Sequence, residues 1–444
     1  MKFKNLQMKR QFVSGKTIVG IDPSKRSHHT TVLDSDGLQL GKSFSFQNTH
    51  TGFTETLWHK VKQRFEEINP ESVIFAVENS CNLWPQLTHY LHTSGYPVVL
   101  VSPVTTHRSR PFLNHDLSHT DPKDALLIAS AARAGYFDFY RTYSEETRST
   151  HQLSLTYCKL LKTYQQHRTR LRSHVEQVFP EFVSILPLST QSSRYVLRKY
   201  FLPEHFINMD IDKEARVLER ISGKQHGEAT LNKLREAAQT SIGIPKTGSE
   251  ITAARLTLDA WLALLEILEQ QLEQGMAELL ALVKQTPYFE ILTSLKGISS
   301  KLAALFIGET RDLASFSHYK QLEKYAGFNL RQLQSGEFVG RRHISRIGNR
   351  RLSWIVYKMT EETARYVPEV RIKYLRRQLV RRGYRKNLVA CVPVLLKLIV
   401  TLIKENRPYQ ELAEKLAELS DLEARYEQAT GKKSKCAVVL KPAA

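Results

Sequence analysis

The sequence predicts a mixed α/β domain followed by long helices and a mostly helical C-terminal domain. Between residues 16 and 143, short β-branched or apolar runs alternate with segments of helical periodicity. Two longer segments, 144–179 and 251–285, then carry apolar residues at spacings close to a heptad repeat. The first pattern is typical of a sheet flanked by helices, and the second is typical of helices that pack along their whole length.

Five runs in the N-terminal region predict strands, and the segments between them predict helices. We expect three strands in succession and then strands that alternate with helices, which indicates a mixed sheet. The predicted strands are Thr17–Asp22, His28–Asp34, 42–46, Ser72–Asn79 and 96–102, and the predicted helices are 51–67, 83–93 and a segment starting near Asp121.

Two long amphipathic helices are expected on either side of an irregular insert at about 181–250. Ser144 is a good N-cap for the first helix, because acidic residues follow it in the first turn. The pattern fits an antiparallel coiled coil or dimerising arm, and it fits an ordinary helical bundle core equally well. The apolar stripes are Leu153, Tyr157, Leu160, Tyr164, Leu171, Val175 and Val178 in the first helix, and Trp261, Leu265, Leu268, Leu272, Leu279 and Leu282 in the second, with Gly275 at a position where a packing side chain is expected.

The C-terminal part begins with two short helices joined at Gly297. An irregular glycine-containing stretch follows, then a basic helical region from Arg371 to Lys386. Pro393 interrupts the apolar segment 388–403, so we expect it to start or kink that helix. The predicted divisions are a basic N-terminal arm (1–15), the α/β domain (16–143), the long-helix region (144–286), a C-terminal domain (287–405), and an extension (406–444) whose tail from Gly431 is expected to be disordered.

The charge balance predicts a polyanionic partner. The 444 residues include 64 Lys and Arg against 44 Asp and Glu, a formal net charge of +20. Nucleic acid is the partner that this excess favours, and a merely soluble basic protein is the alternative. The four cysteines are scattered and fit neither a zinc site nor a disulfide framework, which indicates a reducing cytoplasm. The segment 388–403 is too short and interrupted for a membrane span, and the N-terminus lacks the apolar stretch of a signal peptide.

Four carboxylates form a candidate metal site. Asp22 and Glu78 each end a predicted strand, while Asp121 and Asp124 lie one turn apart at the start of a predicted helix. If the two strands are parallel neighbours, both carboxylates emerge at the sheet edge where open α/β sheets bind ligands. Such a cluster suits Mg²⁺ or Mn²⁺, and therefore phosphodiester cleavage or transfer.

Each carboxylate also has a structural explanation. Asp121 could be an N-cap with Pro122 in the first helical position, and the helix dipole would favour Asp124 in the first turn. Glu78 could cap the next helix, and Asp22 could be an ordinary strand-to-turn residue. The four residues together, in this order of strands and helix, favour the metal site.

The segments around these residues resemble a known family. VGIDPSK at Asp22, FAVEN at Glu78 and SHTDPKDALLIA at Asp121 and Asp124 are similar to the acidic tetrad of the DEDD insertion-sequence transposases. LTSLKGISSKLAALFIGET, YAGFN, QSGEF and HISRIGNRRL resemble that family's second domain, so the resemblance covers roughly residues 16–405. It implies an N-terminal ribonuclease-H-like domain similar to the junction resolvase RuvC, a cytoplasmic, nucleoid-associated bacterial protein, and a mobile element that encodes a bridge RNA.

The resemblance also implies a serine nucleophile within a Ser-Gly pair. The matching residue is Ser335, which would attack the DNA phosphodiester and form a phosphoserine link while Mg²⁺ or Mn²⁺ at the tetrad stabilises the developing charge. The residues alone do not single it out, because a Ser-Gly pair in a polar stretch is usually a turn. Ser299, Ser300 and Ser345 are equally plausible on that basis.

Basic residues in the C-terminal part are candidates for phosphate contacts, with a solvated basic surface as the alternative. Gly348 and Asn349, which precede a helix, could offer backbone amides to an anion. The candidate nucleic-acid-binding residues are Arg341, Arg342, Arg346 and Arg350 near Ser335, and Arg376, Arg377, Arg381 and Arg382 in the basic helical region.

The partners implied by the resemblance are donor DNA, target DNA, a guide RNA that selects both, and further copies of the chain in a dimer or tetramer that share an active site. Two other functions remain open. The chain could be a metal-dependent nuclease or Holliday-junction resolvase that uses water as the nucleophile, or a nucleic-acid-binding protein with an inert ribonuclease-H-like domain.

Overall fold

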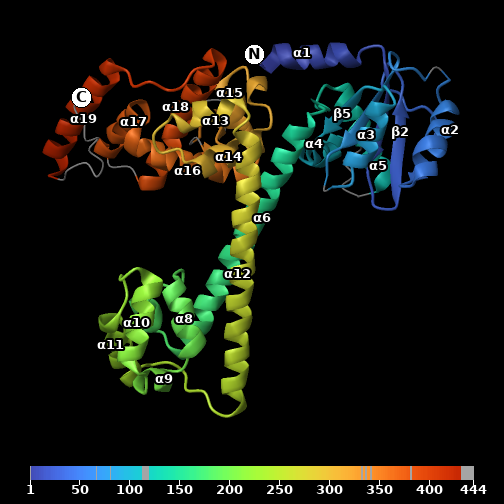
Figure 1. Cartoon of the computed structure of the whole chain (residues 1–444). Coiled ribbons are helices and arrows are strands. Elements are labelled where there is room, and N and C mark those ends of the chain that lie inside the picture. Colours follow the sequence, from blue (N-terminus) through green and yellow to red (C-terminus); the bar gives the residue numbers. More distant parts are fainter. Residues whose placement is uncertain are drawn as a thin grey trace. The chain divides into compact units, whose positions relative to one another are not determined.

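The computed structural model divides the chain into two compact units, residues 1–142 and residues 143–444 (Figure 1). It describes residues 2–66, 68–80, 82–112, 120–331, 334–335, 338–340, 343–380 and 383–431. The tail expected to be disordered lies almost wholly outside these ranges.

Unit 1, residues 1–142, is built on a six-stranded mixed sheet. Its strand order is β3-β2-β1-β4-β5-β6, with β1 parallel to β4, β4 parallel to β5, and the other neighbours antiparallel. The predicted mixed sheet is therefore confirmed, and only β6 has no counterpart in the prediction. The strands are β1 Thr17–Asp22, β2 Ser27–Leu33, β3 Phe44–Gln47, β4 Val73–Glu78, β5 Val98–Val101 and β6 Asp138–Phe139.

Helices cover both faces of this sheet, because alternate residues of β1 and β4 pack into two different cores. Val19 and Phe75 face α2 (Leu57–Lys62) and α3 (Pro85–Thr93), whereas Ile18 and Ile74 face α5 (Asp121–Arg133). The helix predicted over 51–67 is shorter than expected: it opens as a π-helix, Gly52–Thr56, and ends at Lys62.

The basic N-terminal arm is a helix, α1 (Lys2–Val13), within unit 1. Phe12 and Val13 pack into the α5 side of the sheet, and the Lys9 ammonium lies 3.1 Å from Asp138. Two further short helices, α4 (Pro103–Ser109) and the 3-10 turn Arg110–Phe112, follow β5.

Unit 2, residues 143–444, is organised by two long helices, α6 (Glu145–Val178) and α12 (Ser249–Val283). They lie side by side in opposite directions (Figure 1). The hydroxyl of Ser144 accepts a hydrogen bond from the backbone amide of Thr147, which confirms the predicted N-cap.

The apolar stripe, or seam, predicted for α12 is confirmed in the middle of the helix, and at other positions the buried residue is the next one along the chain. Leu265, Leu268, Leu272 and Leu279 are buried as predicted, but Leu262, Met276 and Val283 occupy the seam in place of Trp261, Gly275 and Leu282. The side chain of Met276 fills the space that the expected register assigned to Gly275, and a methyl group on Gly275 would meet nothing within 4 Å. The helix pair is also part of two bundle cores, one at each end, so both the antiparallel pairing and the bundle core expected from the sequence are present.

The insert between the long helices is a small helical lobe rather than an irregular segment. Its core contains the aromatic side chains of Phe179, Phe182 and Phe206, packed against the end of α6. Its helices are α7 Phe182–Ile185, α8 Gln191–Lys199, α9 Pro203–Ile207, α10 Ile211–Ser222 and α11 Glu228–Gln239.

The opposite end of the helix pair joins a larger helical core. Gly297 has φ +97° between α13 and α14, as the two-helix prediction expects. The helices of this part are α13 Pro287–Thr293, α14 Ser300–Thr310, a 3-10 turn Leu313–Ser315, α15 Tyr319–Tyr325, α16 Arg350–Tyr366, α17 Pro368–Leu379, α18 Tyr384–Glu405 and α19 Ala413–Thr430. Two short strand pairs lie between α15 and α16 in the sequence: β7 Leu330–Arg331 with β10 His343–Ile344, and β8 Gln334–Ser335 with β9 Phe338–Val339.

Helix α18 corrects the expectation for Pro393. The helix starts at Tyr384, well before the proline, and continues through it to Glu405, so Pro393 does not start the helix. Within the described ranges, α18 is the one helix long and apolar enough to cross a membrane, and 50% of its most apolar window is buried inside the protein. Leu388, Val392, Leu395 and Ile399 pack in the core of unit 2, which is the pattern of a core helix.

Candidate active site and nucleic-acid interface

Asp22 and Glu78 lie at the same edge of the sheet in unit 1. β1 and β4 are parallel neighbours with Ile21 opposite Val77, so the next residue of each strand is a carboxylate at the carboxyl end. The condition stated from the sequence, that the two strands are parallel neighbours, is therefore met, and both acids lie where an open α/β sheet binds ligands. The hydroxyl of buried Thr106, on α4, donates a hydrogen bond to Glu78.

A close contact between β1 and α5 brings the other two carboxylates to this edge. A methyl group on Gly20 would lie 2.6 Å from the carbonyl oxygen of Ala125 and 2.7 Å from the Cβ of Ala129. Only glycine at this position lets the helix pack so closely against the strand. The first turn of α5, which carries Asp121 and Asp124, therefore lies next to the end of β1.

The structure disfavours two of the purely structural explanations for these acids. Asp121 is the first residue of α5 and Thr120 occupies the cap position, so Asp121 is not the N-cap. Glu78 does not cap the next helix, because α3 begins seven residues later at Pro85.

The four carboxylates act on one another electrostatically. Burial raises the pKa of Asp22 from 3.8 to about 7, and the negative charges of Glu78, Asp124 and Asp121 add to that rise. The nearby Arg110 guanidinium acts in the opposite direction on the pKa of Asp22. A half-buried carboxyl group that ionises only near neutral pH is typical of a site short of positive charge.

The side chains of Arg110 and His29 accompany the cluster. Arg110 holds Asp124 through its Nε and Nη2 atoms, with its Nη2 3.1 Å from both carboxylate oxygens. His29 Nε2 lies 3.0 Å from an oxygen of Asp121. Within the described ranges, no three His, Cys, Asp or Glu side chains adopt an arrangement that would hold a metal ion. The all-oxygen donor set nevertheless fits a hard divalent cation, which would compete with Arg110 for Asp124.

Ser335 lies in unit 2 as the last residue of β8. It pairs with Phe338 of β9 in a short antiparallel ladder. A second antiparallel strand pair is formed by β7 and β10, in which His343 lies opposite Arg331. The sequence pattern alone suggested a turn at the Ser-Gly pair. The backbone places Ser335 at the end of a strand, and Gly336 lies outside the described residues.

Two of the four arginines predicted near Ser335 line a pocket of about 550 Å³. Arg346, which has φ +57°, and Arg350 are exposed and share this pocket with Trp354 and Tyr357 on α16. Arg341 and Arg342 lie outside the described residues. The pocket combines guanidinium groups with aromatic side chains, which suits nucleic acid.

Gly348 and Asn349 were expected to offer backbone amides to an anion, but the structure uses the start of this helix differently. Asn349 is the N-cap of α16, and its side-chain oxygen accepts hydrogen bonds from the amides of Arg351 and Leu352. Those amides are therefore engaged within the chain. The Asn349 amide group and the Arg351 guanidinium in turn bind Glu309, which is fully buried.

The basic helical region is partly engaged in ion pairs. Arg371 is buried and pairs with Glu423 at 2.6 Å, so the suggestion that it contacts phosphates is wrong. Arg376 pairs with Glu418 at 2.6 Å but keeps 61% of its side chain exposed. Arg377 is half-buried, and Arg381 and Arg382 lie outside the described residues.

Sequence reasoning missed the residues that build the acidic site around its carboxylates. Arg110, His29 and Thr106 each contact one of the four acids, and Gly20 sets the distance of α5 from β1. Of these residues, only Gly20 could have been noticed in the sequence, as a small residue two positions before Asp22. The other contacts depend on how segments that are distant in the sequence pack together.

Comparison with protein families identifies both regions. Residues 19–180 match a family model described as "Transposase", of the DEDD type of IS110 elements, and residues 289–375 match "Transposase IS116/IS110/IS902 family". A search of curated proteins gave no match. The two models agree on the family, together span more than half of the chain, and include all four acids and Ser335. The chain therefore belongs to the IS110 family of DEDD transposases, and it is a DNA transposase.

Proposed function

We propose that this transposase breaks and rejoins DNA strands with the hydroxyl of Ser335 as nucleophile and with a divalent cation, Mg²⁺ or Mn²⁺, held by Asp22, Glu78, Asp121 and Asp124. The observation that carries the proposal is the mutual repulsion of the four carboxylates, which adds to the effect of burial and raises the pKa of Asp22 to about 7. A divalent cation relieves that repulsion, and it supplies charge stabilisation to phosphate oxygens when it is bound.

The fold of unit 1 supports this assignment. We infer that its sheet is of the ribonuclease-H-like, RuvC-like type, because three antiparallel strands precede two strands parallel to β1, and the acids lie at the carboxyl edge. We take residues 16–143 as this domain, 144–286 as the helical connection with its insert, and 287–405 as the domain that carries the serine.

The serine step is a transesterification. The Ser335 oxygen forms a bond to phosphorus, the bond from phosphorus to one deoxyribose oxygen breaks, and that oxygen leaves with a proton as a DNA hydroxyl. The reverse reaction on a second strand releases Ser335 and joins DNA, so no external energy source is required. The exposed guanidinium groups of Arg346 and Arg350 can hold phosphates at the pocket that they line.

The resemblance of the chain to its family also supports a guide RNA and a homodimer or homotetramer as partners. The net charge of +20 agrees with the binding of more than one nucleic acid. An active site shared between copies of the chain would couple cleavage to assembly.

Trapping of a covalent protein–DNA adduct tests the nucleophile. Full-length protein is incubated with labelled element-end DNA, guide RNA and Mg²⁺, quenched in detergent, and separated on a denaturing gel. We expect an adduct with the natural sequence and with Ser345→Ala, the matched control serine, and none with Ser335→Ala. Cleavage by Ser335→Ala at the natural rate, with no adduct in any sample, would establish water as the nucleophile and a resolvase-like nuclease instead.

The metal site has a separate test. We expect Mn²⁺ to raise the melting temperature of the natural protein and to have little effect on Asp22→Asn. An equal rise in both proteins would remove Asp22 from the metal site.

A further inference from the structure

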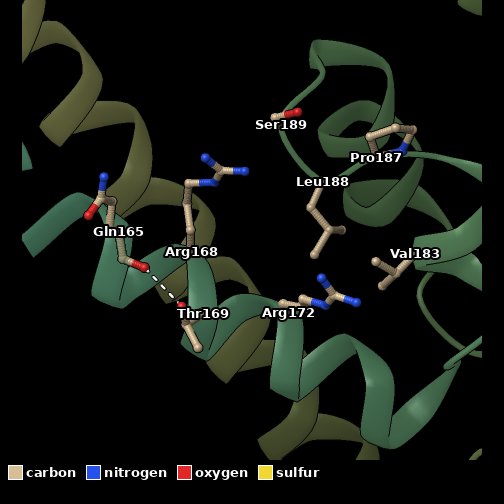
Figure 2. A pocket seen from close by; sticks show the side chains of 8 residues that line it. All are labelled: Gln165, Arg168, Thr169, Arg172, Val183, Pro187, Leu188 and Ser189. Carbon is tan, nitrogen blue, oxygen red and sulfur yellow. Dashed lines mark hydrogen bonds between the residues drawn. The ribbon is translucent and has the colours of Figure 1, made fainter. Parts of the chain in front are cut away.

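A pocket of about 410 Å³ lies between α6 and the insert lobe of unit 2. Figure 2 shows two arginines of α6 on one side and the segment around Leu188 on the other. Neither the acidic cluster nor the serine segment contributes to it. Its volume lies within the range of small-ligand sites.

The α6 side of the pocket is polar and positively charged. Gln165, Arg168, Thr169 and Arg172 follow one another at helical spacings of three, one and three residues, so they share one face of α6. The Thr169 hydroxyl donates to the Gln165 backbone carbonyl at 3.1 Å, which leaves the guanidinium groups as the main donors to a ligand. Arg172 pairs with Glu176 at the surface, whereas Arg168 has no ion pair among the residues that the structure describes.

The opposite side of the pocket is apolar. Val183 of α7 and Leu188 of the following loop are only half-buried, and in Figure 2 their side chains extend toward the Arg172 guanidinium. A ligand that fills this space therefore meets cationic groups on one side and an apolar surface on the other.

The charges of the two long helices are strongly unequal. α6 carries six Lys and Arg against three Asp and Glu, whereas α12 carries one against six. No ion pair within the described ranges joins a Lys or Arg of α6 to α12. The hydrogen bond from Arg194 lowers the pKa of Glu269 on α12, and Arg168 adds its positive charge to this effect at longer range. The α12 carboxylates Glu266 and Glu269 instead pair with Arg198 and Arg194 of α8. The guanidinium group of Arg168, which has no ion pair within those ranges, can therefore still bind an external anion.

We propose that this pocket binds an unpaired nucleotide of a DNA strand, with its phosphate on Arg168 and Arg172 and its base against Leu188 and Val183. Guanidinium groups form charge-assisted, bidentate hydrogen bonds with phosphate. A base in a duplex is stacked on both faces, so only an unpaired base can lie against the apolar wall. A transposase opens and exchanges DNA strands, and such a pocket would hold one strand away from the chemistry.

The neighbouring pocket shows what a site without this role looks like. It is also lined by arginines, Arg194 and Arg198, but both are matched by α12 carboxylates. Its charges are balanced within the protein, so it offers less attraction to a phosphate than the pocket at Arg168.

The test compares DNA binding by two variants that lose the same charge from the same helix. One is Arg168→Gln/Arg172→Gln, and the control is Lys159→Gln/Lys162→Gln, whose lysines are exposed on α6 outside the pocket. Full-length protein is titrated into labelled single-stranded DNA, duplex DNA and an RNA hairpin, with fluorescence anisotropy recorded at several salt concentrations. Circular dichroism and melting curves check that each variant folds.

For single-stranded DNA, we expect the arginine variant to bind about tenfold more weakly. The slope of log K against log salt should become shallower by about 0.7 for each phosphate that the variant no longer neutralises. The lysine control should lose less affinity, and duplex binding should change little in both variants. A second variant, Leu188→Asp, should also weaken binding to single-stranded DNA, because it puts a negative charge opposite the arginines.

Three results would overturn the proposal: equal losses in the arginine and lysine variants, which indicate a general charge effect; a loss confined to the RNA hairpin, which assigns the pocket to RNA; or unchanged binding in both the arginine and the Leu188→Asp variants. The measurement is of binding alone, so it is independent of whether Ser335 is the nucleophile.

Discussion

Carboxylates in the two units differ in how completely positive or hydrogen-bonding partners match their charge. In unit 2, Glu309 is fully buried, and its two oxygens accept hydrogen bonds from Asn349 at 2.7 Å and from Arg351 at 2.8 Å. In unit 1, four carboxylates meet Arg110 and His29, and one of the acids, Asp22, has a pKa of about 7. A carboxylate whose partners are complete holds a fold together, whereas a cluster with too little positive charge is arranged for a ligand.

The largest effect should come from removing one charge of the cluster. We expect Asp22→Asn to lower the rate of DNA strand cleavage by about 10³-fold or more, since an electrostatic contribution to phosphoryl transfer is lost. Its metal-free melting temperature should stay the same or rise, because repulsion with Glu78, Asp121 and Asp124 is relieved. Single-turnover cleavage and thermal melting in EDTA measure the two quantities. A large fall in the metal-free melting temperature would place Asp22 in the same structural class as Glu309.

Loss of the buried carboxylate in unit 2 should reduce stability. We expect Glu309→Ala to lower the free energy of unfolding by about 3 kcal/mol, because the polar groups of Asn349 and Arg351 lose their partner. Glu418→Ala is the control: it removes the carboxylate that pairs with Arg376 and Lys415 at the surface and should lower the free energy of unfolding much less than Glu309→Ala. Urea unfolding measures both. An equal loss of unfolding free energy in the two variants would mean that the buried position of Glu309 does not make its hydrogen bonds more stabilising.

The contact that builds the acidic site can be tested through Gly20. A methyl group there overlaps Ala125 and Ala129 of α5, so we expect Gly20→Ala to destabilise the protein by about 1–3 kcal/mol and to weaken the stabilisation by Mn²⁺. Gly275→Ala offers the matched control, since its new methyl group meets open space inside a helix and should stabilise by about 0.5–1 kcal/mol. If Gly20→Ala has the same stability and the same response to Mn²⁺ as the natural protein, the close packing of α5 on β1 is not required to assemble the site.

The smallest effect concerns pH. The pKa of Asp22 is raised from 3.8 to about 7, so between these values the native protein retains a proton that the unfolded chain has released. The metal-free protein should therefore lose stability as pH rises from about 4 to about 7, by about 1 kcal/mol once solvent screening of a half-buried group is allowed for. Urea unfolding in EDTA at pH 5 and pH 8 measures the change, and Asp22→Asn should show a flatter dependence. An identical slope in the variant would assign the effect to other groups.

The sequence predicted the sheet better than it predicted the site around it. β1 and β4 are almost wholly buried runs rich in β-branched residues, so their bounds and the acids that end them could be read directly. The α12 seam was off by one at Trp261, Gly275 and Leu282, because neighbouring apolar residues allow two registers and only packing selects between them. The insert was harder, since its helices are short and bury their aromatic residues against one another and against the ends of the two long helices.

The polar contacts of the site escaped prediction for a different reason. Arg110 and Asp124 are fourteen residues apart, and His29 reaches Asp121 from the neighbouring strand, so neither pairing follows a local period. Ser335 was identified by family resemblance alone, because a serine in a polar segment carries no pattern that distinguishes a nucleophile from a turn.

The long helices of unit 2 have a mechanical consequence. At 1.5 Å per residue, the 34-residue α6 is about 50 Å long, and α12 matches it along its length. One end is fixed in the larger helical core, where the contact of Ser154 with Gly308 leaves no room for a methyl group, and the other end carries the insert lobe. Such a rod acts as a lever: a tilt of about 10° at the packed end carries the lobe through about 9 Å. A tilt of that size near α14 would therefore move the lobe by a distance comparable to the size of a nucleotide.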